Sequence, residues 1–370
     1  MSSSLVSSAP PGTRRPLRTN IVSWDGGGLG TDIDLLTRAL QHAGCSVAFK
    51  GRRHRIPRNR AHSLLMTGGV VLAQQWAGLT RRPQFDVNFF IESVFPEYLP
   101  MARVNCLLVH PEWFRAENLP HVPRLDFILA KTPSAVEMCR ELPVVCRNIN
   151  FTSPDQRIPG FVRRGPLRCL HLAGQSAVKG SEAVVEAWSR HPEWPELTVV
   201  RRARRYGGEA APPLPPLPNV RYETDYLSSE QLRALQNECE VHVLPSQAEG
   251  YGHVIGEAMS CGAIVVTTDA PPMNELVGSD RGLVVRVARS EPMCLSRKHY
   301  VEIADLETQL TTVFAMSPDA RAELSRNARA WYEAQDQRFE TSLRAFLDEV
   351  PRIAAGHAAP RPRPSEHAAS

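Results

Sequence analysis

Residues 243–262 read VLPSQAEGYGHVIGEAMSCG. An apolar run ends at Pro245, a short polar loop follows, and the periodicity of the next residues predicts a helix. Gly250 and Gly252 carry no side chains, so a ligand can closely approach the main-chain N–H groups at the start of that helix. The segment therefore predicts a buried strand, a ligand-binding loop and a helix in direct succession.

Two acidic side chains bracket these glycines. Glu249 lies at the tip of the loop, and Glu257 lies one or two turns into the helix, where it can face the same side. Each carboxylate can accept hydrogen bonds through both oxygens, which suits neighbouring hydroxyls of a sugar ring. We expect one carboxylate to bind a hexose and the other a ribose. The alternative is a turn acid followed by a solvated helix residue.

A regular alternation of apolar runs and helical stretches extends on both sides of this segment. Strands are predicted at 19–24, 102–110, 125–130, 167–172, 197–201, 241–245 and 263–267. Helices are predicted at 32–42, 134–142, 180–190, 229–238, 252–261, 320–335 and 339–350. Such alternation is typical of βαβ units that build a parallel sheet. The predicted fold class is therefore α/β.

A polar stretch with glycine and proline, residues 152–165, divides this pattern into two halves. Each half opens with a strand, a glycine-containing turn and a helix, the turns being 26–30 and 173–175. In doubly wound folds, ligands bind outside the carboxyl ends of the strands. The pattern predicts two Rossmann-like doubly wound domains that face a cleft.

The composition of the 370-residue chain excludes several classes of protein. Its hydrophobic content of 42% is enough for a real core, which excludes wholesale disorder. The eight cysteines form no C-x-x-C pair and mostly lie in apolar runs, so we expect reduced thiols and no disulfide or zinc framework. No secretory signal and no run of 18 uninterrupted apolar residues occurs, which predicts a cytoplasmic protein.

The charge of the chain does not indicate a nucleic-acid partner. The formal net charge is only +4. Residues 50–60, KGRRHRIPRNR, hold six lysines and arginines and no acid, but they lack the interleaved aromatic side chains of a nucleic-acid site. This run is either a solvated loop or a contact for an anionic acceptor, and it allows at most a peripheral membrane contact.

The motif around the glycines resembles that of a known family. Glu249 and Glu257 reproduce the Glu-x7-Glu motif of the retaining GT-B glycosyltransferases of family four, and residues 249–252 match its E-G-[FY]-G form. Asn274-Glu275-Leu276-Val277 lies where the family shows a P-E-[IL]-V segment. The resemblance implies a GT-B fold, a nucleotide-diphosphate-sugar donor as co-substrate, and transfer without a bound metal or other cofactor.

The resemblance also implies a division of labour between the domains. We expect an acceptor domain over 19–160, a nucleotide-sugar-binding domain over 161–335, and a helix over 336–350 that returns to the first domain. Residues 1–18 and 351–370, rich in proline, arginine and small residues, are expected to be loose tails.

A second element lies at residues 173–180, AGQSAVKG, where the family has a G-R-x-x-x-x-K-G segment whose Arg and Lys hold the donor diphosphate. Lys179 matches this segment, but Gln175 does not match its arginine. A metal-free site must neutralise the leaving diphosphate with cations and N–H groups. The basic run 200–205, which includes Arg201 and Arg202, offers candidate substitutes, and the alternative is a solvated basic loop.

The N-terminal half supplies further candidates. By resemblance, Gly27 and Gly28 approach the phosphate and sugar of the donor from across the cleft, with Thr31 or Asp32 capping the helix that follows. His110 ends an apolar run at the carboxyl end of a predicted strand, so we expect it to contact the transferred sugar. Its alternative is a structural histidine, and Glu92 is a weaker candidate of the same kind.

The first functional hypothesis is a retaining glycosyltransferase with His110, Lys179 and Glu249 as catalytic residues. The donor site would comprise Gly27, Gly28, Gly174, Gln175, Lys179, Arg201, Glu249, Gly250, Tyr251, Gly252 and Glu257. The second hypothesis is a degenerate GT-B protein that binds a sugar nucleotide or a partner without turnover, because Gln175 departs from the motif. The third hypothesis is an NAD-dependent oxidoreductase. The sequence argues against it, because the acidic residue that follows a dinucleotide-binding fingerprint is missing. The sequence does not identify the donor sugar, the nucleobase or the acceptor. The acceptor could be a glycan, a lipid-linked sugar, a small molecule or a protein.

Overall fold

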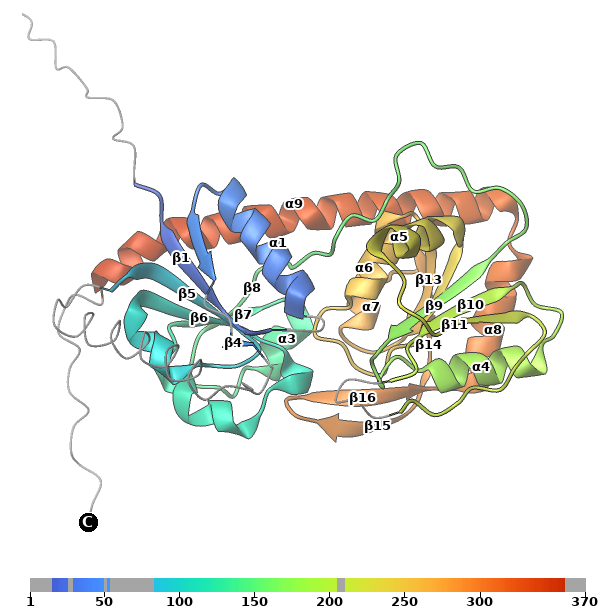
Figure 1. Cartoon of the computed structure of the whole chain (residues 1–370), viewed down its shortest axis with the longest axis horizontal. Helices are drawn as coiled ribbons and strands as arrows, with labels where there is room; N and C mark the ends of the chain where they lie inside the picture. The colour runs from blue at the N-terminus through green and yellow to red at the C-terminus, as the bar shows by residue number, and fades with distance from the viewer. Residues whose placement is uncertain (1–14, 26–28, 50–51, 54–82, 205–209, 357–370) are drawn as a thin grey trace, which may run out of the picture.

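The computed structural model describes residues 15–25, 29–49, 52–53, 83–204 and 210–356. This part of the chain forms two lobes, each built around a six-stranded parallel sheet. Figure 1 shows them side by side, with the N-terminal lobe on the left and the C-terminal lobe on the right. The α/β class and the two Rossmann-like units expected from the sequence are confirmed.

The N-terminal lobe holds the first sheet. Across the sheet, its strands are β3 (Ser46–Phe49), β1 (Arg18–Val22), β5 (Phe85–Ile91), β6 (Ala102–Leu108), β7 (Phe127–Ala130) and β8 (Cys146–Asn148). Its helices are α1 (Leu29–His42) and α3 (Pro133–Met138), with 3-10 turns η1 (Pro96–Met101), η2 (Pro111–Trp113) and η3 (Ala116–Arg124). A short bridge joins β2 (Trp24–Asp25) to β4 (Arg52–Arg53). All neighbouring strands of the six run parallel, so their carboxyl ends share one edge.

The C-terminal lobe repeats this plan. Across the sheet, its strands are β11 (Val220–Glu223), β10 (Leu197–Arg201), β9 (Cys169–Gly174), β12 (Val241–Leu244), β13 (Ile264–Thr268) and β14 (Gly282–Val285). Its helices are α4 (Ser181–Arg190), α5 (Ser229–Glu238), α6 (His253–Ser260), α7 (Met273–Leu276) and α8 (Ile303–Ala315). Helix α5 begins with a capping box, in which the Ser228 hydroxyl accepts the Gln231 N–H and the Gln231 side chain accepts the Ser228 N–H.

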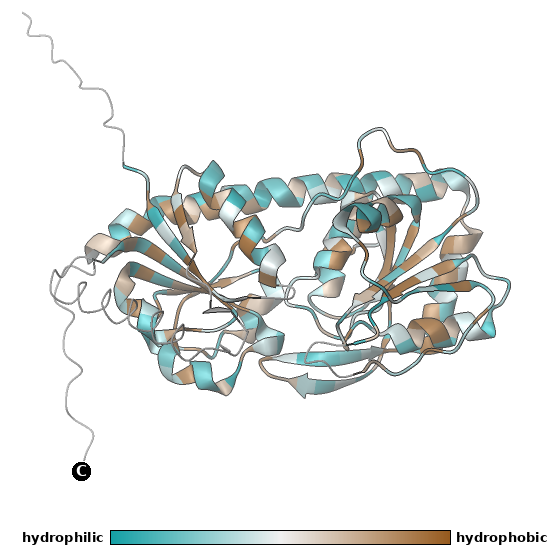
Figure 2. Ribbon diagram, viewed as in Figure 1, coloured by the Kyte–Doolittle hydropathy of each residue, from teal (hydrophilic) through white to brown (hydrophobic). Residues whose placement is uncertain are grey.

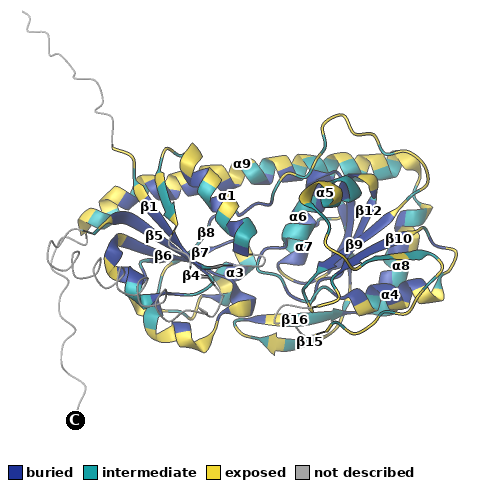
Figure 3. Cartoon of the chain, viewed as in Figure 1, coloured by how far each residue is buried: buried dark blue, intermediate teal, exposed yellow. Residues whose placement is uncertain are grey.

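The central strands are buried on both faces. All seven residues of β5 and all five of β13 are buried, and Figure 3 shows the central strands of both sheets in dark blue. Helices cover the sheets, and Figure 2 shows hydrophilic residues, in teal, along much of these helices. This layering explains why central strands such as β13, IVVTT, are rich in apolar and β-branched residues on both faces.

A single long helix, α9 (Pro318–Gly356), spans both lobes (Figure 1). The sequence pattern predicted two helices here, but no helix breaker separates 335 from 339, and the 39 residues form one helix about 58 Å long. It packs on α6 and β13 in one lobe and on β5 and β6 in the other. It also continues to Gly356, so residues 351–356, expected to belong to a loose tail, are helical. Among the described residues, no helix combines the length and apolar character needed to cross a membrane.

A β-hairpin links the lobes at the side opposite α9. Its strands, β15 (Val287–Met293) and β16 (Ser296–Val301), leave the C-terminal lobe and run under both lobes in Figure 1. At its tip, the Leu295 N–H donates to the Pro111 carbonyl over 3.0 Å. Near its base, the His299 N–H donates to the Gln247 carbonyl over 2.7 Å. The hairpin, which the sequence did not predict, therefore touches the loops that follow β6 and β12.

Candidate active site

Two loops of the C-terminal lobe, 174–180 after β9 and 245–252 after β12, lie against each other. The Gln247 N–H donates to the Val178 carbonyl over 2.8 Å. Gly180 has a positive φ of 72°, and a Cβ added there would lie 2.3 Å from the Pro245 carbonyl oxygen. Only glycine satisfies both conditions, which explains its place in the sequence. The two segments singled out separately in the sequence thus form one surface.

An ion pair joins the two loops at this surface. The Lys179 ammonium donates a hydrogen bond to Glu249 Oε1, and the two side chains are only 14% and 10% exposed. An ammonium can donate further hydrogen bonds to a phosphate, and a carboxylate can accept further hydrogen bonds from hydroxyls. Such an ion pair can therefore bind a ligand that carries both groups. The residue predicted to hold phosphate and the residue predicted to hold sugar are therefore in direct contact.

The start of α6 brings main-chain N–H groups to the same place. Gly252 has a φ of 104° and precedes the first helical residue, His253. The Tyr251 side chain, however, is 2% exposed and packs edge-on against Phe151, with ring centroids 5.8 Å apart. The Tyr251 side chain belongs to the core. Only the main chain of Tyr251 can therefore make the predicted contact with the donor.

Glu257 lies on α6, half-buried between α5 and the segment that connects the lobes. Its Oε2 accepts a hydrogen bond from Gln236 Nε2 over 3.0 Å. Burial raises the pKa of Glu257, although the charge of His253 and the hydrogen bond from Gln236 act in the opposite direction. The carboxylate is thus held in place within the C-terminal lobe.

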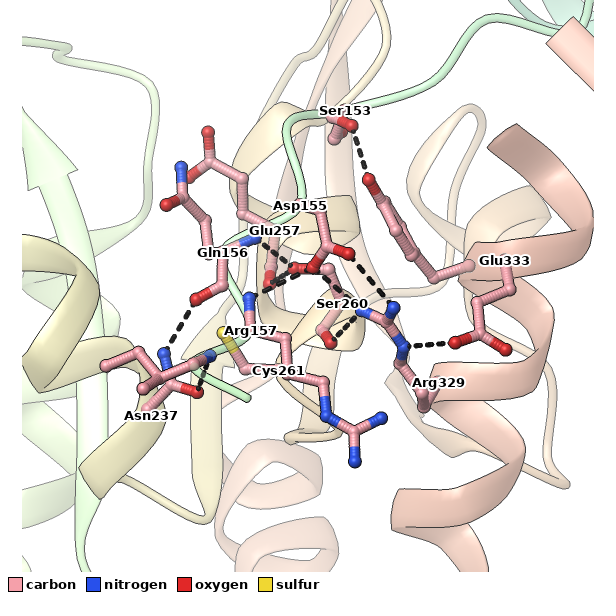
Figure 4. Close-up of polar contacts among 12 residues, drawn as sticks. Ser153, Asp155, Gln156, Arg157, Asn237, Glu257, Ser260, Cys261, Arg329 and Glu333 are labelled. Carbon is pink, nitrogen blue, oxygen red and sulfur yellow. Dashed lines mark hydrogen bonds and ion pairs between the residues drawn. The ribbon is translucent and has the colours of Figure 1, made fainter. Parts of the chain in front are cut away.

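The connecting segment is fastened to α6 and α9 around Glu257, as Figure 4 shows. The Gln156 N–H donates to Ser260 Oγ over 2.9 Å. Arg329 on α9 makes two hydrogen bonds to Asp155, of 2.7 and 2.9 Å, and a third of 2.7 Å to the Ser260 carbonyl. These contacts fix the position of α6 relative to the path between the lobes.

Three charged or polar side chains form a buried cluster in the N-terminal lobe. The Lys131 ammonium lies 2.7 Å from Asp32 Oδ2 and 2.6 Å from His110 Nε2. The ammonium donates to Asp32. His110 Nε2 also lies 2.9 Å from Asp32 Oδ2, so its tautomer decides whether it accepts from Lys131 or donates to Asp32. Burial alone would raise the pKa of Asp32, but the charge of Lys131 and the contacts with His110 hold it well below its usual range. We expected Thr31 or Asp32 to cap the helix, but α1 begins at Leu29 and Asp32 is instead an ion-pair partner.

This cluster reaches across to the C-terminal lobe. His253 Nε2 lies 3.0 Å from the second oxygen of Asp32. A second contact between the lobes joins Glu275 to Ser134, whose N–H and hydroxyl donate to it over 2.9 and 3.1 Å. Glu275 is the acid of the Asn-Glu-Leu-Val segment that carried part of the family resemblance. The candidate site therefore has walls from both lobes.

Two acids follow the N-terminal strands close to His110. Glu92, after β5, has a positive φ of 67° and lies 3.7 Å through Oε2 from His110 Nδ1. Glu112, on η2, is 4% exposed, and a Cβ on Gly250 would lie 2.6 Å from its Oε1. His110 itself is 7% exposed, at the carboxyl end of β6.

The basic run after β10 is divided between two roles. The Arg201 guanidinium is buried, donating to the Pro212 carbonyl over 3.0 Å and to Glu182 over 3.2 Å. The Arg202 main-chain N–H donates to the Gly174 carbonyl over 2.8 Å, and its guanidinium lies over the Tyr226 ring at 5.5 Å. Arg202 Nη1 is buried with no hydrogen-bond partner among the described residues. Arg202, a member of the basic run expected to offer substitutes for the missing arginine, is therefore better placed than Arg201 beside the Gly174 turn.

The remaining predicted positions are placed as follows. Gly174 has a φ of 54° and open space around it, and Gln175 is half-buried in the same turn. Gly27 and Gly28 lie outside the described residues, as does the basic run 50–60 apart from the main chain of 52–53. Within the described ranges, no three His, Cys, Asp or Glu side chains are grouped to hold a metal ion.

Comparison with known proteins identifies the type of enzyme. Residues 222–293 match the family model of the glycosyl transferases group 1. This range includes both Glu249 and Glu257 and the segment around Glu275. No curated protein matches the chain. This similarity, over the part of the chain that carries both glutamates, supports a glycosyltransferase.

Solved structures show that the fold is GT-B. Sucrose-phosphate synthase from Thermosynechococcus elongatus matches with a TM-score of 0.63 and 14% identity, covering 91% of this chain and 99% of that one. Anabaena Alr3699/HepE in complex with UDP and glucose matches with a TM-score of 0.59 and 16% identity, covering 91% and 99%. A chain of the GtfA/B complex matches with a TM-score of 0.56 and 15% identity, covering 77% of this chain but only 61% of its own.

Proposed function

We propose that the chain is a retaining glycosyltransferase that transfers a sugar from a nucleoside-diphosphate donor to an acceptor hydroxyl without a metal ion. The observation that carries the proposal is the contact between Lys179 and Glu249, which brings a phosphate-binding turn and a sugar-binding loop together. That a structurally similar Anabaena protein is in complex with UDP and glucose agrees with such a donor.

The donor diphosphate would lie against the turn 174–180. Lys179 supplies one cation, and the unpartnered Nη1 of Arg202 supplies a second donor beside Gly174. Arg202 would then take the part of the arginine that Gln175 replaces. Fixed cations and N–H groups stabilise the developing charge of a leaving diphosphate without reorganising in the transition state.

The two acids of the motif would bind the rest of the donor. Glu249 and the N–H groups near Gly250 and Gly252 would position the transferred sugar. Glu257, held by Gln236, would accept hydrogen bonds from the ribose hydroxyls. His110 would meet the sugar from the N-terminal lobe.

In the proposed reaction, the bond between the anomeric carbon and the phosphate oxygen breaks as the acceptor oxygen attacks from the same face. The acceptor proton passes to the departing phosphate oxygen, so neither glutamate has to act as a nucleophile. This distinguishes the site from a glycosidase, in which two opposed carboxylates carry the chemistry.

The proposal is tested by screening UDP-glucose, UDP-galactose, UDP-N-acetylglucosamine and GDP-mannose by thermal shift, and then measuring release of the nucleoside diphosphate. At about a hundredfold excess over its Kd, a bound donor stabilises the native protein by about 2.7 kcal/mol. The variant Lys179→Ala should slow release by about 10²–10³-fold, as expected for loss of one charge-stabilising donor.

Lys298→Ala, which removes a lysine from the hairpin, is the matched control and should keep the wild-type rate. Binding without any release would favour the degenerate sugar-nucleotide-binding protein suggested by Gln175. If no donor of the panel binds, the proposal is wrong.

A further inference from the structure

Glu112 is a buried acid to which the proposed reaction assigns no role. It lies on η2, two residues after His110, and its side chain comes from the N-terminal lobe. Only 4% of its surface is exposed. A carboxyl group this deeply buried is costly unless its oxygens find hydrogen-bond partners. The local sequence, His110-Pro111-Glu112, gives no structural reason for an acid there.

The carboxyl group rests on the glycine loop of the other lobe. A Cβ on Gly250 would lie 2.6 Å from Glu112 Oε1, 3.1 Å from Oε2 and 3.2 Å from the carboxyl carbon. The absence of a side chain at Gly250 therefore leaves the space that this carboxyl occupies. Any ligand seated on the loop meets Glu112 from the N-terminal side.

One oxygen of this carboxyl has no partner. Glu112 Oε2 is buried and makes no hydrogen bond with any described residue. Burial raises the pKa of Glu112, and the charge of Glu249 acts in the same direction, while His110 and Lys131 oppose it. A carboxyl group in these surroundings can both accept a hydrogen bond and, when protonated, donate one.

We propose that Glu112 binds a hydroxyl of the transferred sugar through its free Oε2, on the side of the sugar opposite Glu249. The inference rests on the proposed function and adds to it a sugar contact from the N-terminal lobe. It assigns Glu112 to recognition of the sugar and leaves the nucleoside diphosphate to the other lobe. The sugar would then be gripped between acids from both lobes.

The test compares the affinity for each sugar nucleotide of the panel with the affinity for UDP or GDP alone, by calorimetry. In Glu112→Ala, the preference for the sugar nucleotide should fall about tenfold, or 1.4 kcal/mol, while the Kd for the nucleoside diphosphate stays the same. Glu112→Gln, which keeps the shape and the hydrogen-bonding capacity, should retain most of the preference.

If Glu112 had a purely structural role, the result would differ. Displacement of the Gly250 loop would weaken the binding of the sugar nucleotide and of the nucleoside diphosphate to the same extent. An equal loss for the two ligands, or an unchanged preference in Glu112→Ala, overturns the inference while leaving the proposed function intact. Wild-type protein that binds no sugar nucleotide overturns both.

The contact itself can be checked independently. Gly250→Ala places a Cβ against the carboxyl, so it should lower stability in the wild type and much less in the Glu112→Ala background. Strict additivity of the two substitutions would show that Glu112 does not rest on this loop and would contradict the inference.

Discussion

At the scale of single residues, His171 shows how the site is supported from beneath. It lies in β9, and its Nδ1 is 2.7 Å from the Val243 carbonyl of β12. A carbonyl only accepts, so Nδ1 carries the proton, and Nε2 accepts from the Ser181 hydroxyl at 2.8 Å, at the start of α4. One neutral imidazole thus joins the two strands from which the candidate loops emerge.

This arrangement predicts a loss of stability in acid. Burial lowers the pKa of His171 to about 4, despite the hydrogen bond to Val243. The unfolded chain binds a proton below its ordinary pKa of about 6.5 and the folded chain does not, so stability is full above that pH. It falls by about 1.4 kcal/mol per pH unit as the pH drops towards 4.

His171→Gln should therefore flatten the dependence of the unfolding free energy on pH between 4 and 6.5, measured by urea denaturation. His42→Gln removes a histidine whose side chain is 70% exposed and serves as the control. If His42→Gln flattened the pH dependence of the unfolding free energy as much as His171→Gln, this explanation would be contradicted.

At the scale of elements, α6 and the segment that connects the lobes are packed without space between them. A Cβ on Gly256 would lie 2.3 Å from Ser153 Oγ and 2.8 Å from Ser153 Cβ. Ser153 also lies 3.3 Å through Oγ from His253 Nδ1, at the start of the same helix. Gly256 thus allows the connecting segment to touch the helix that carries Glu257.

Replacing Gly256 should lower the stability of the protein, because the connecting segment leaves no room for a side chain. Gly256→Ala would normally favour a helix, but here the clash with Ser153 should cost about 1–3 kcal/mol of the unfolding free energy. Ser153→Gly removes both clashing atoms and should rescue most of the loss. Gly30→Ala, on α1 with nothing within 4 Å, is the matched control and should be neutral or slightly stabilising. A destabilisation that Ser153→Gly does not relieve would contradict this packing.

The elements also show what the sequence could predict. Leu197–Arg201 and Ser229–Glu238 form a strand and a helix with the predicted bounds, because local periodicity and capping determine them. The hairpin 287–301 was missed because its strands are rich in polar residues and depend on contacts with the loops after β6 and β12. The helix α9 was divided in two because its apolar face is interrupted around 336–338.

The candidate site was predicted in part for the same reason. Lys179 and Glu249 follow buried strands, and parallel topology brings the carboxyl ends of such strands together. Lys131 also ends a predicted strand, so its position was a usable signal. The contact of Glu112 with Gly250 and that of His253 with Asp32 join residues more than a hundred positions apart, and no local pattern encodes them.

At the scale of the whole molecule, the two lobes meet through polar contacts that surround the candidate site. Asp32 pairs with Lys131 in its own lobe and with His253 in the other. Glu275 accepts two hydrogen bonds from Ser134, and α9 packs on both sheets. A donor bound to the C-terminal lobe would therefore meet side chains of the N-terminal lobe directly.

The central claim is that Glu249 and Glu257 hold the hydroxyls of a sugar nucleotide. Its most direct test is a calorimetric titration of Glu257→Ala with the donor found in the panel, beside Glu238→Ala, which removes a half-exposed acid from the end of α5. We expect Glu257→Ala to lose detectable binding while it melts like the wild type, and Glu238→Ala to bind normally. Unchanged donor affinity in folded Glu257→Ala would contradict the claim.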